Sequence, residues 1–333
     1  MMEYKGKYQI VDLGKVKTYS LFTRPSEVSL ENLIDLKRIL NNPLMYDSKE
    51  IRIVADAIID ARKNGKPVIV FSGAHAVKNG LSPIYNDLIN RKIITAFASN
   101  GAFTIHDFEL AISGKTSENV PHALEKGLFG FAEETNKYIN NALTHGNKLK
   151  LGYGESIGRL MAGEAFPEKV NFPHKEISVQ YNAFVNDVPF CAHCAIGDDI
   201  YHTTKYFDGE AIGGCSGRDF LIFANEVTKL TDGGVCLLVG SAVVGVEAYL
   251  KAFSIAANIG KTPNKIITAD FDLREANISD AQMSKKDQPT YYFRDIKSIV
   301  VRIPNAFNGR GYYIKGDQNL TLPTLYKFIM EKI

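Results

Sequence analysis

The chain has 333 residues, a length that accommodates one large α/β domain or two smaller ones. Hydrophobic residues make up 45% of the chain and charged residues 23%, so it can bury a full core and is not expected to be disordered. The formal net charge is +2, and no basic stripe interleaved with aromatic residues occurs, which argues against a nucleic-acid partner.

The first 48 residues mix polar and apolar positions and contain several turn-forming residues. We expect residues 1–48 to form an N-terminal arm or a partner-contacting extension, followed by a single domain over residues 49–333. The N-terminus has no apolar signal core, and the longest apolar stretch, residues 233–246, contains glycines and is too short to span a bilayer. These features predict a cytoplasmic protein without a membrane partner.

From residue 49 onward, short apolar runs alternate with stretches of helical periodicity. Apolar positions from Ile51 to Ile59 repeat at helical spacing, and Asn64-Gly65 is typical of a helix end. The apolar runs are continuous rather than alternating, as in strands that are covered on both faces. The predicted strands are residues 68–71, 93–98, 188–196, 235–239, 266–269 and 298–303. This order predicts an α/β fold with a doubly wound, mostly parallel sheet, into which a mostly helical segment is inserted at about residues 114–175.

Two loops after consecutive predicted strands carry residues that suit a nucleotide. The first loop contains Ser72, Gly73 and Ala74, and the second contains Ser99, Asn100 and Gly101. Glycines let the backbone approach a ligand closely, and the free N–H groups at a helix start favour phosphate. Open α/β sheets bind ligands outside the carboxyl ends of their strands. The first loop lacks the full G-x-G-x-x-G spacing, so an ordinary strand-to-helix turn is the alternative there.

His106 and Asp107 follow the second of these loops. The pair suits a cationic or hydroxylated group. His106 is the best candidate for a general base, because an imidazole titrates near neutral pH. The alternative is a helix cap with a satisfied polar pair.

Three later segments add carboxylates and glycines at predicted strand ends. Asp208 and Glu210 belong to a segment that is crowded with carboxylates, which suits a polyamine or another cation, although a solvated loop is the alternative. The Gly240-Ser241 turn can pass under a dinucleotide, and Asp270 and Asp272 flank an aromatic residue at the next strand end. For both of these segments, an ordinary turn is the alternative.

Cys191 and Cys194 are separated by two residues, a spacing that also occurs in zinc and redox sites. Structural zinc needs four ligands, and no second pair with suitable spacing is present. A redox motif lies at a helix start, whereas these cysteines lie within a predicted strand. We therefore expect reduced, packed cysteines and no metal.

Taken together, these loops resemble those of the deoxyhypusine synthase family, in the same order from about residue 65 to residue 330. Residues 71–80 are similar to the family's Thr-Ser-Asn loop that ends in Ser-Gly, and residues 99–102 to its Thr-Thr-Ala-Gly-Gly loop. The Gly240-Ser241 turn falls on its triple-glycine turn, and residues 268–272 resemble its Asn-Thr-Ala-Gln-Glu-Phe-Asp strand end. Bacterial deoxyhypusine-synthase-like proteins are more similar still, since they share Ser-Asn-Gly-Ala followed by His-Asp-Phe-Glu.

The resemblance implies a Rossmann-like fold that binds NAD, and a homotetramer with sites at subunit interfaces. In the family, NAD oxidises spermidine, and an aminobutyl group passes through a lysine imine to a lysine of a translation factor. The family's Trp-Gly-Lys, which supplies the imine lysine, is absent here, because the chain has no Trp. Lys285 and Lys286 lie in roughly the same region but in a charged segment of different context.

The sequence therefore predicts an NAD-dependent enzyme that oxidises a polyamine or an amino-acid amine, with or without aminoalkyl transfer. A true deoxyhypusine or homospermidine synthase and a non-catalytic NAD-binding sensor or assembly protein are the alternatives. The expected catalytic residues are His106 and Lys286. The expected cofactor-binding residues are Ser72, Gly73, Ala74, Ser99, Asn100, Gly101, Asp107, Gly240, Ser241 and Asp270, and the expected substrate-binding residues are Asp208, Glu210 and Asp272.

Overall fold

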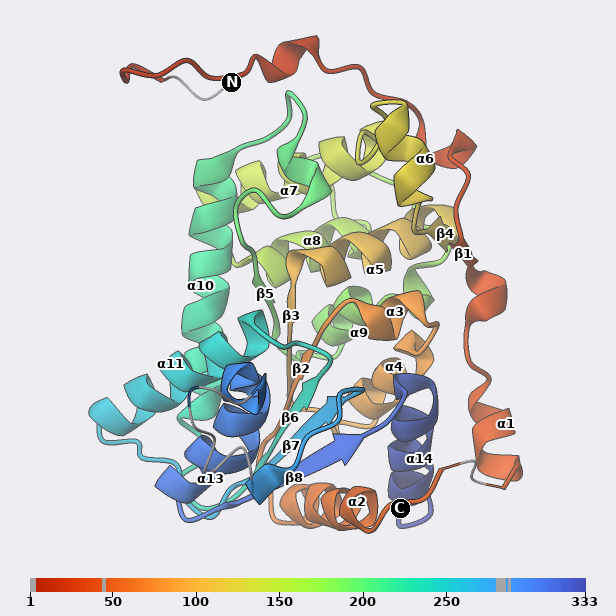
Figure 1. Cartoon of the computed structure of the whole chain (residues 1–333). Coiled ribbons are helices and arrows are strands. Elements are labelled where there is room, and N and C mark those ends of the chain that lie inside the picture. The colour runs from red at the N-terminus through yellow and green to blue at the C-terminus, as the bar shows by residue number, and fades with distance from the viewer. Residues whose placement is uncertain (1–3, 44–45, 280–285, 287–288) are drawn as a thin grey trace.

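A six-stranded sheet forms the centre of the computed structural model, which describes residues 4–43, 46–279, 286 and 289–333 (Figure 1). The strand order is β5-β3-β2-β6-β7-β8, and all neighbouring strands pair in parallel. The strands are β2 (Val68–Ser72), β3 (Ala96–Asn100), β5 (Phe190–His193), β6 (Val235–Val239), β7 (Ile267–Asp272) and β8 (Arg310–Lys315). The predicted doubly wound, mostly parallel α/β fold is confirmed.

Alternate side chains of β2 belong to two hydrophobic clusters, one on each face of the sheet. Val68 and Val70 belong to one cluster, and Ile69 and Phe71 to the other. The first face is covered by α2 (Lys49–Lys63), α4 (Ser82–Asn90) and α14 (Gln318–Met330), and the second by α10 (Gly209–Val227), α11 (Val244–Asn258) and η7 (Ile296–Arg302). Because helices cover both faces, β2 and β6 are buried along their whole length.

The helix α2 begins and ends where its sequence predicts. Ser48 accepts hydrogen bonds from the backbone N–H groups of Glu50 and Ile51, which is an N-cap. The chain leaves the helix at Asn64, and Gly65 follows with a φ of +66°. The apolar stripe of α2 is buried against the sheet.

The prediction of a strand at residues 298–303 is wrong. These residues lie in the π-helical η7 and in α13 (Ile303–Ala306). A short, continuous apolar run fits a buried helix as well as a strand, and here Ile299 and Ile303 pack on one face of the sheet. The sixth strand is instead β8, an edge strand whose polar and half-buried positions contain no long apolar run.

The segment between β3 and β5 is mostly helical. It contains α5 (Gly101–Ser113), α6 (Val120–Glu125), α7 (Glu133–Lys148), α8 (Tyr153–Ala162), η4 (Lys175–Ile177) and α9 (Val179–Val185). Figure 1 shows α5, α7 and α8 on the side of the sheet where β3 leads into α5. These helices therefore lie next to the carboxyl edge of the sheet.

The N-terminal segment runs along one side of the molecule, from near α6 to α1 (Leu36–Asn41) (Figure 1). It contains the short helices η1 (Leu13–Lys15), η2 (Leu21–Thr23) and η3 (Leu30–Asn32). The antiparallel pair β1 (Val28–Ser29) and β4 (Lys115–Thr116) joins it to the chain that follows α5. A contact of this segment with a partner stays a prediction. Within the described ranges, no helix combines the length and apolar character that a membrane span requires.

Candidate functional site

The strands β2, β3 and β5 form one half of the sheet, and β6, β7 and β8 form the other, so the two halves meet between β2 and β6. Open α/β sheets bind ligands outside the carboxyl ends of their strands at such a switch point. The loops after the two strands touch here, because Gly73 N donates to Val239 O at 2.8 Å and a Cβ on Gly73 would clash with Gly240 O. Gly73 therefore allows direct backbone contact between the two loops.

A cavity of about 200 Å³ lies beside α5 and is lined by charged side chains. The charged and titratable residues of its lining are Arg24, Lys78, His106, Glu109, Glu118, Asp198 and Asp199. They come from the N-terminal segment, α3 (His75–Lys78), α5, the chain after α5 and the loop after β5. Segments far apart in the sequence thus meet at the carboxyl edge of the sheet, with four carboxyl groups and two cationic side chains around one space.

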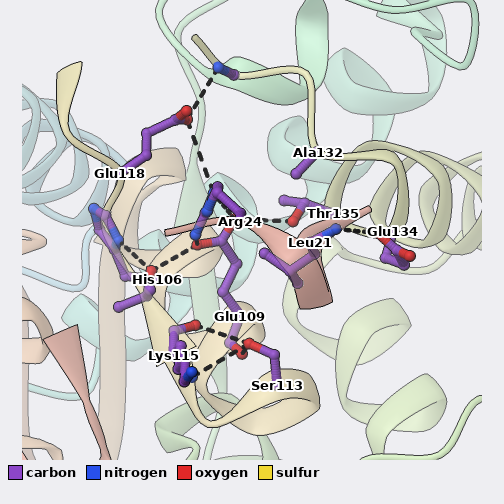
Figure 2. A network of polar contacts seen from close by, with 12 residues as sticks. Leu21, Arg24, His106, Glu109, Ser113, Lys115, Glu118, Ala132, Glu134 and Thr135 are labelled. Atoms are coloured by element: carbon purple, nitrogen blue, oxygen red, sulfur yellow. Dashed lines mark hydrogen bonds and ion pairs between the residues drawn. The ribbon is translucent and has the colours of Figure 1, made fainter. Parts of the chain in front are cut away.

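Arg24 and Glu109 form a buried ion pair at this cavity (Figure 2). The guanidinium donates from Nη1 and Nη2 to the two carboxylate oxygens at 2.9 and 2.6 Å. Glu109 also accepts hydrogen bonds from Thr135 Oγ1 at 2.9 Å and Thr116 Oγ1 at 2.7 Å. Each carboxylate oxygen thus has two donors, which is the condition for keeping such a charge out of water.

The carboxylates of Glu118 and Glu134 form hydrogen bonds that hold the N-terminal segment beside the cavity. Glu118 accepts from the hydroxyl of Tyr19 at 2.9 Å and lies 3.8 Å from Arg24 Nη1. Burial raises the pKa of Glu118, against the lowering effects of Tyr19 and Arg24. Glu134 accepts from Ser20 Oγ at 2.8 Å and from Leu21 N at 2.6 Å. The segment therefore supplies part of the cavity wall and is held by hydrogen bonds and charge.

The ring of His106 is held in one tautomer by the same network. Its Nδ1 lies 2.8 Å from Thr116 Oγ1, whose single proton is donated to Glu109. Because a carboxylate only accepts, Thr116 must accept from His106 Nδ1–H, and Nε2 is left unprotonated. Burial, and to a smaller extent the nearby Lys78, lowers the pKa of His106 to about 4, while Glu109 acts in the opposite direction.

Asp107, the neighbour of His106 in the sequence, lies in a different environment. It is 1% exposed and accepts hydrogen bonds from Ser178 Oγ at 2.5 Å and from the backbone N–H groups of Val179 and Gln180 at 2.7 and 3.1 Å. These are donors at the start of α9, so Asp107 holds that helix terminus. Consecutive residues of a helix point about 100° apart, so His106 and Asp107 do not share the cavity.

The loop after β5 brings two carboxyl groups to the cavity. Asp199 is 6% exposed, accepts from the Tyr201 hydroxyl at 3.1 Å and lies against the first turn of α5, where a Cβ on Gly101 would clash with it. Burial raises the pKa of Asp199 to about 6. Asp198 is exposed, and its carboxylate forms no hydrogen bond or ion pair within the described part of the chain.

The β6–α11–β7 unit carries a glycine spacing that was not predicted. Gly240, Ala242 and Gly245 follow β6 as G-x-A-x-x-G, in which alanine replaces the second glycine of the dinucleotide-binding fingerprint. Gly240 has a φ of +57°, and a Cβ on Gly245 would lie 2.5 Å from Leu238 Cδ1. Ser241 Oγ accepts from Gly245 N at 3.0 Å and holds the start of α11. A tight turn and close helix–sheet packing, two roles of the fingerprint glycines, are thus both present.

Asp270, near the end of β7, is a buried carboxyl group without a partner among the described residues. It is 1% exposed, and neither of its oxygens has a hydrogen-bond donor among the described residues. Burial, followed by the charges of Asp295 and Asp272, raises its pKa well above the usual range. Asp272 is already bonded to Arg274. In the fingerprint, an acidic residue on the second strand accepts from a ribose hydroxyl, so the β6–α11–β7 unit fits the nucleotide of NAD.

Two predicted cofactor residues lie inside the protein. Ser72 and Ser99 are fully buried. The hydroxyl of Ser72 is hydrogen-bonded to Gly73 O and the Tyr85 hydroxyl, and that of Ser99 donates to Ser72 O. Their side chains hold the two loops together. Asn100 is half-buried and caps α5 by accepting from Phe103 N at 3.0 Å, which leaves its amide N–H₂ without a partner among the described residues.

The predicted substrate carboxylates lie apart from the residues that line the cavity. Asp208 caps α10 and accepts from Thr144 Oγ1 at 3.1 Å, and Glu210 is exposed. Lys286 is exposed in a turn, and Lys285 lies outside the described residues. The roles given to these residues stay predictions.

Arg24, Lys78, Glu109 and Thr116 were not predicted as site residues. The local signal for Glu109 was its spacing from the other cavity residues of α5, because Ala102, Ile105, His106 and Glu109 follow each other as i, i+3, i+4 and i+7 on one helix face. Arg24 and Lys78 had no such signal, since only the tertiary fold brings them beside α5.

No family model matches the chain, and no curated protein sequence matches it. Solved structures of similar fold include ArgZ, an arginine dihydrolase from the ornithine-ammonia cycle in cyanobacteria, with 13% identity, a TM-score of 0.49 and coverage of 87% of this chain and 34% of ArgZ. The ternary complex of AgrE with ornithine and NAD+ has 16% identity, a TM-score of 0.46 and coverage of 86% and 34%. A proposed deoxyhypusine synthase from Entamoeba histolytica has 10% identity, a TM-score of 0.44 and coverage of 91% and 86%.

This chain thus spans about a third of the length of ArgZ and of AgrE. All three TM-scores are below 0.5, so we draw no functional conclusion from these likenesses. Membership of the deoxyhypusine synthase family stays a prediction.

Proposed function

We propose that the protein catalyses the NAD-dependent oxidation of a small primary amine in the cavity beside α5. The observation that carries this proposal is the hydrogen-bonded chain from His106 Nδ1 through Thr116 to Glu109, which leaves Nε2 to accept a proton, in a cavity lined by more carboxyl groups than cations. Arg24 and Glu109 neutralise each other, so one ammonium and three carboxyl groups remain. This surplus of negative charge favours a cationic ligand. A cavity of about 200 Å³ suits a small amine rather than a dinucleotide.

His106 acts as the general base. An ammonium nitrogen must lose a proton before its lone pair can assist the departure of a hydride from the adjacent carbon, and Nε2 is the acceptor for that proton. A pKa of about 4 keeps the ring neutral at pH 7 but makes it a weaker base than an ordinary imidazole, so proton uptake at Nε2 depends on the opposing effect of the Glu109 carboxylate. Once Nε2 is protonated, the Glu109 carboxylate stabilises the imidazolium through the hydroxyl of Thr116.

The residues that suit NAD lie at the carboxyl edge of the sheet. Gly240, Ser241 and the first turn of α11 would hold the pyrophosphate, and Asp270, whose oxygens have no donor among the described residues, would accept from a ribose hydroxyl. Gly73 and Asn100, at the ends of β2 and β3, complete the proposed site. When bound, NAD accepts the hydride from the carbon next to the substrate nitrogen.

Formation of NADH from a panel of primary amines, amino acids and polyamines tests the proposal. The wild-type protein should reduce NAD with at least one of them. His106→Asn should lower kcat by roughly 10²–10⁴-fold with little change in NAD affinity. Asp270→Asn should weaken NAD binding by roughly tenfold while the rate at saturating NAD is retained. Tight NAD binding without turnover of any amine would favour the non-catalytic sensor.

A polyamine substrate, aminoalkyl transfer through Lys286, a homotetramer and a cytoplasmic location remain predictions. Transfer through a lysine imine requires a free, desolvated amine, whereas Lys286 is exposed. Borohydride trapping with labelled spermidine tests that role directly. Absence of label from the peptide containing Lys286 would exclude it.

A further inference from the structure

We infer that the small molecule taken by the cavity beside α5 is an α-amino acid, whose carboxylate binds Lys78 and whose ammonium group binds Asp198 and Asp199. The inference rests on the proposed function for the chemistry of the cavity, and it names the substrate class. The inference distinguishes amino acids, which carry a carboxylate and an ammonium group, from polyamines, which carry only ammonium groups.

Lys78 is the cation that makes this distinction. It is the last residue of α3, is partly buried and lines the same cavity as His106. Within the described ranges its ammonium group forms no hydrogen bond or ion pair, whereas the other cation of the lining, Arg24, is ion-paired with Glu109. Lys78 lies close enough to His106 to add to the effect of burial in lowering the pKa of that ring. An unpaired ammonium group thus lies beside the proposed base.

Asp198 and Asp199 supply the opposite charge. Asp198 is exposed and has no partner among the described residues, and Asp199 is buried against the start of α5 with the Tyr201 hydroxyl as a donor. No ion pair joins either carboxylate to the Lys78 ammonium group, so each carboxylate lies more than 4.0 Å from it. The cavity therefore holds separate positive and negative groups that do not neutralise each other.

A zwitterion satisfies both groups at once. Its carboxylate removes the cost of an unpaired Lys78, and its ammonium group pairs with the aspartates. A diamine or polyamine satisfies the aspartates but meets Lys78 with a like charge. Because the carboxylate and the ammonium of an α-amino acid are attached to the same carbon, binding both also orients the C–H bond that the proposed reaction breaks.

Calorimetric titration with matched ligands tests the inference. The ligands are the proteinogenic amino acids and ornithine, each compared with its decarboxylated amine (ornithine with putrescine, for example), and the titration is done without NAD so that no ligand is oxidised while its binding is measured. The proteins are the wild type, Lys78→Met, Lys78→Arg and the control Lys126→Met, which removes an exposed lysine outside the cavity. At least one amino acid should bind the wild type tenfold or more tightly than its amine.

Lys78→Met should weaken binding of that amino acid by tenfold or more and leave binding of the amine unchanged or tighter. Lys78→Arg should restore most of the affinity, and Lys126→Met should behave as the wild type. The inference is overturned if no amino acid binds, if amines bind as tightly as amino acids, or if Lys78→Met weakens both classes equally. An amino acid that binds through Lys78 but yields no NADH would leave the inference standing and remove the proposed oxidation.

Discussion

The carboxylate of Glu109 lies one hydroxyl group away from the ring of His106, because Thr116 Oγ1 is 2.7 Å from Glu109 Oε2 and 2.8 Å from His106 Nδ1. The histidine and the glutamate share one face of α5, and the threonine comes from β4. Glu109 is also ion-paired with Arg24, so its carboxylate only accepts, and the hydroxyl proton of Thr116 is donated to it. The buried carboxylate of Glu109 therefore determines, through Thr116, that Nε2 is the nitrogen of His106 that accepts a proton.

Thr116→Val should remove this choice of tautomer while keeping the shape of the side chain. We expect a mixture of tautomers at His106, and a kcat for amine oxidation that falls roughly 10–100-fold, since a hydrogen bond to a charged group is worth about 1.5–3 kcal/mol. The ¹⁵N shifts of the imidazole nitrogens measure the tautomer directly. Thr116→Ser should retain the Nδ1–H form. A Thr116→Val protein with wild-type imidazole shifts would contradict the assignment.

The sequence predicted much of the sheet but only part of the site. Five strands were found because they are apolar runs between turns, whereas β8 lacks such a run and residues 298–303 form a helix that is equally apolar. His106 was proposed as a base because an imidazole titrates near neutral pH. Asp107 was expected to bind the cofactor together with the loop residues, but a helix turns adjacent residues apart, and Asp107 caps α9 instead. Arg24 and Lys78 reach the cavity through the tertiary fold, which local patterns do not encode.

Protonation of His106 should destabilise the folded protein in acid. The pKa is lowered from 6.5 to about 4 by burial, so as the pH falls the unfolded chain binds this proton first. The stabilisation is complete above about pH 6.5 and is lost as the pH falls to about 4, to a total of about 3 kcal/mol. Urea unfolding at a series of pH values measures it. His106→Gln should show a shallower loss than the wild type, and His122→Gln, at an exposed site, should follow the wild type.

Loss of Arg24 should cost far more stability than loss of an exposed cation. Arg24→Met leaves Glu109 buried without its counter-charge, which typically costs about 3–5 kcal/mol. Lys66→Ala breaks the exposed pair with Asp232 and should cost less than about 1 kcal/mol. The double variant with Glu109→Gln should recover part of the loss. Chemical unfolding provides these values, and a cost below about 1 kcal/mol for Arg24→Met would show that the pair does not hold the N-terminal segment.

Hydrogen exchange adds a local readout to the same variant. Tyr19, Ser20 and Leu21 are tied to Glu118 and Glu134, and Arg24 is the ion-paired anchor that follows them. In Arg24→Met, the backbone amides of this segment should exchange faster than in the wild type, while those of β2 and β6 stay protected. Equal exchange in the two proteins would mean that Glu118 and Glu134 hold the segment without Arg24.

Gly245→Ala should shift the start of α11 away from the sheet and weaken NAD binding at the same time. The added Cβ would lie 2.5 Å from Leu238 Cδ1 and 2.7 Å from Phe71 Cδ1, so the start of the helix must shift, at a cost of about 1–3 kcal/mol. That shift moves the N–H groups proposed to face the pyrophosphate. The matched control is Gly217→Ala in α10, where a Cβ meets nothing within 4 Å and should stabilise the helix by up to about 1 kcal/mol. Thermal unfolding and NAD titration of the two variants separate the effects, and an unchanged NAD affinity in a destabilised Gly245→Ala would exclude this helix start from the nucleotide site.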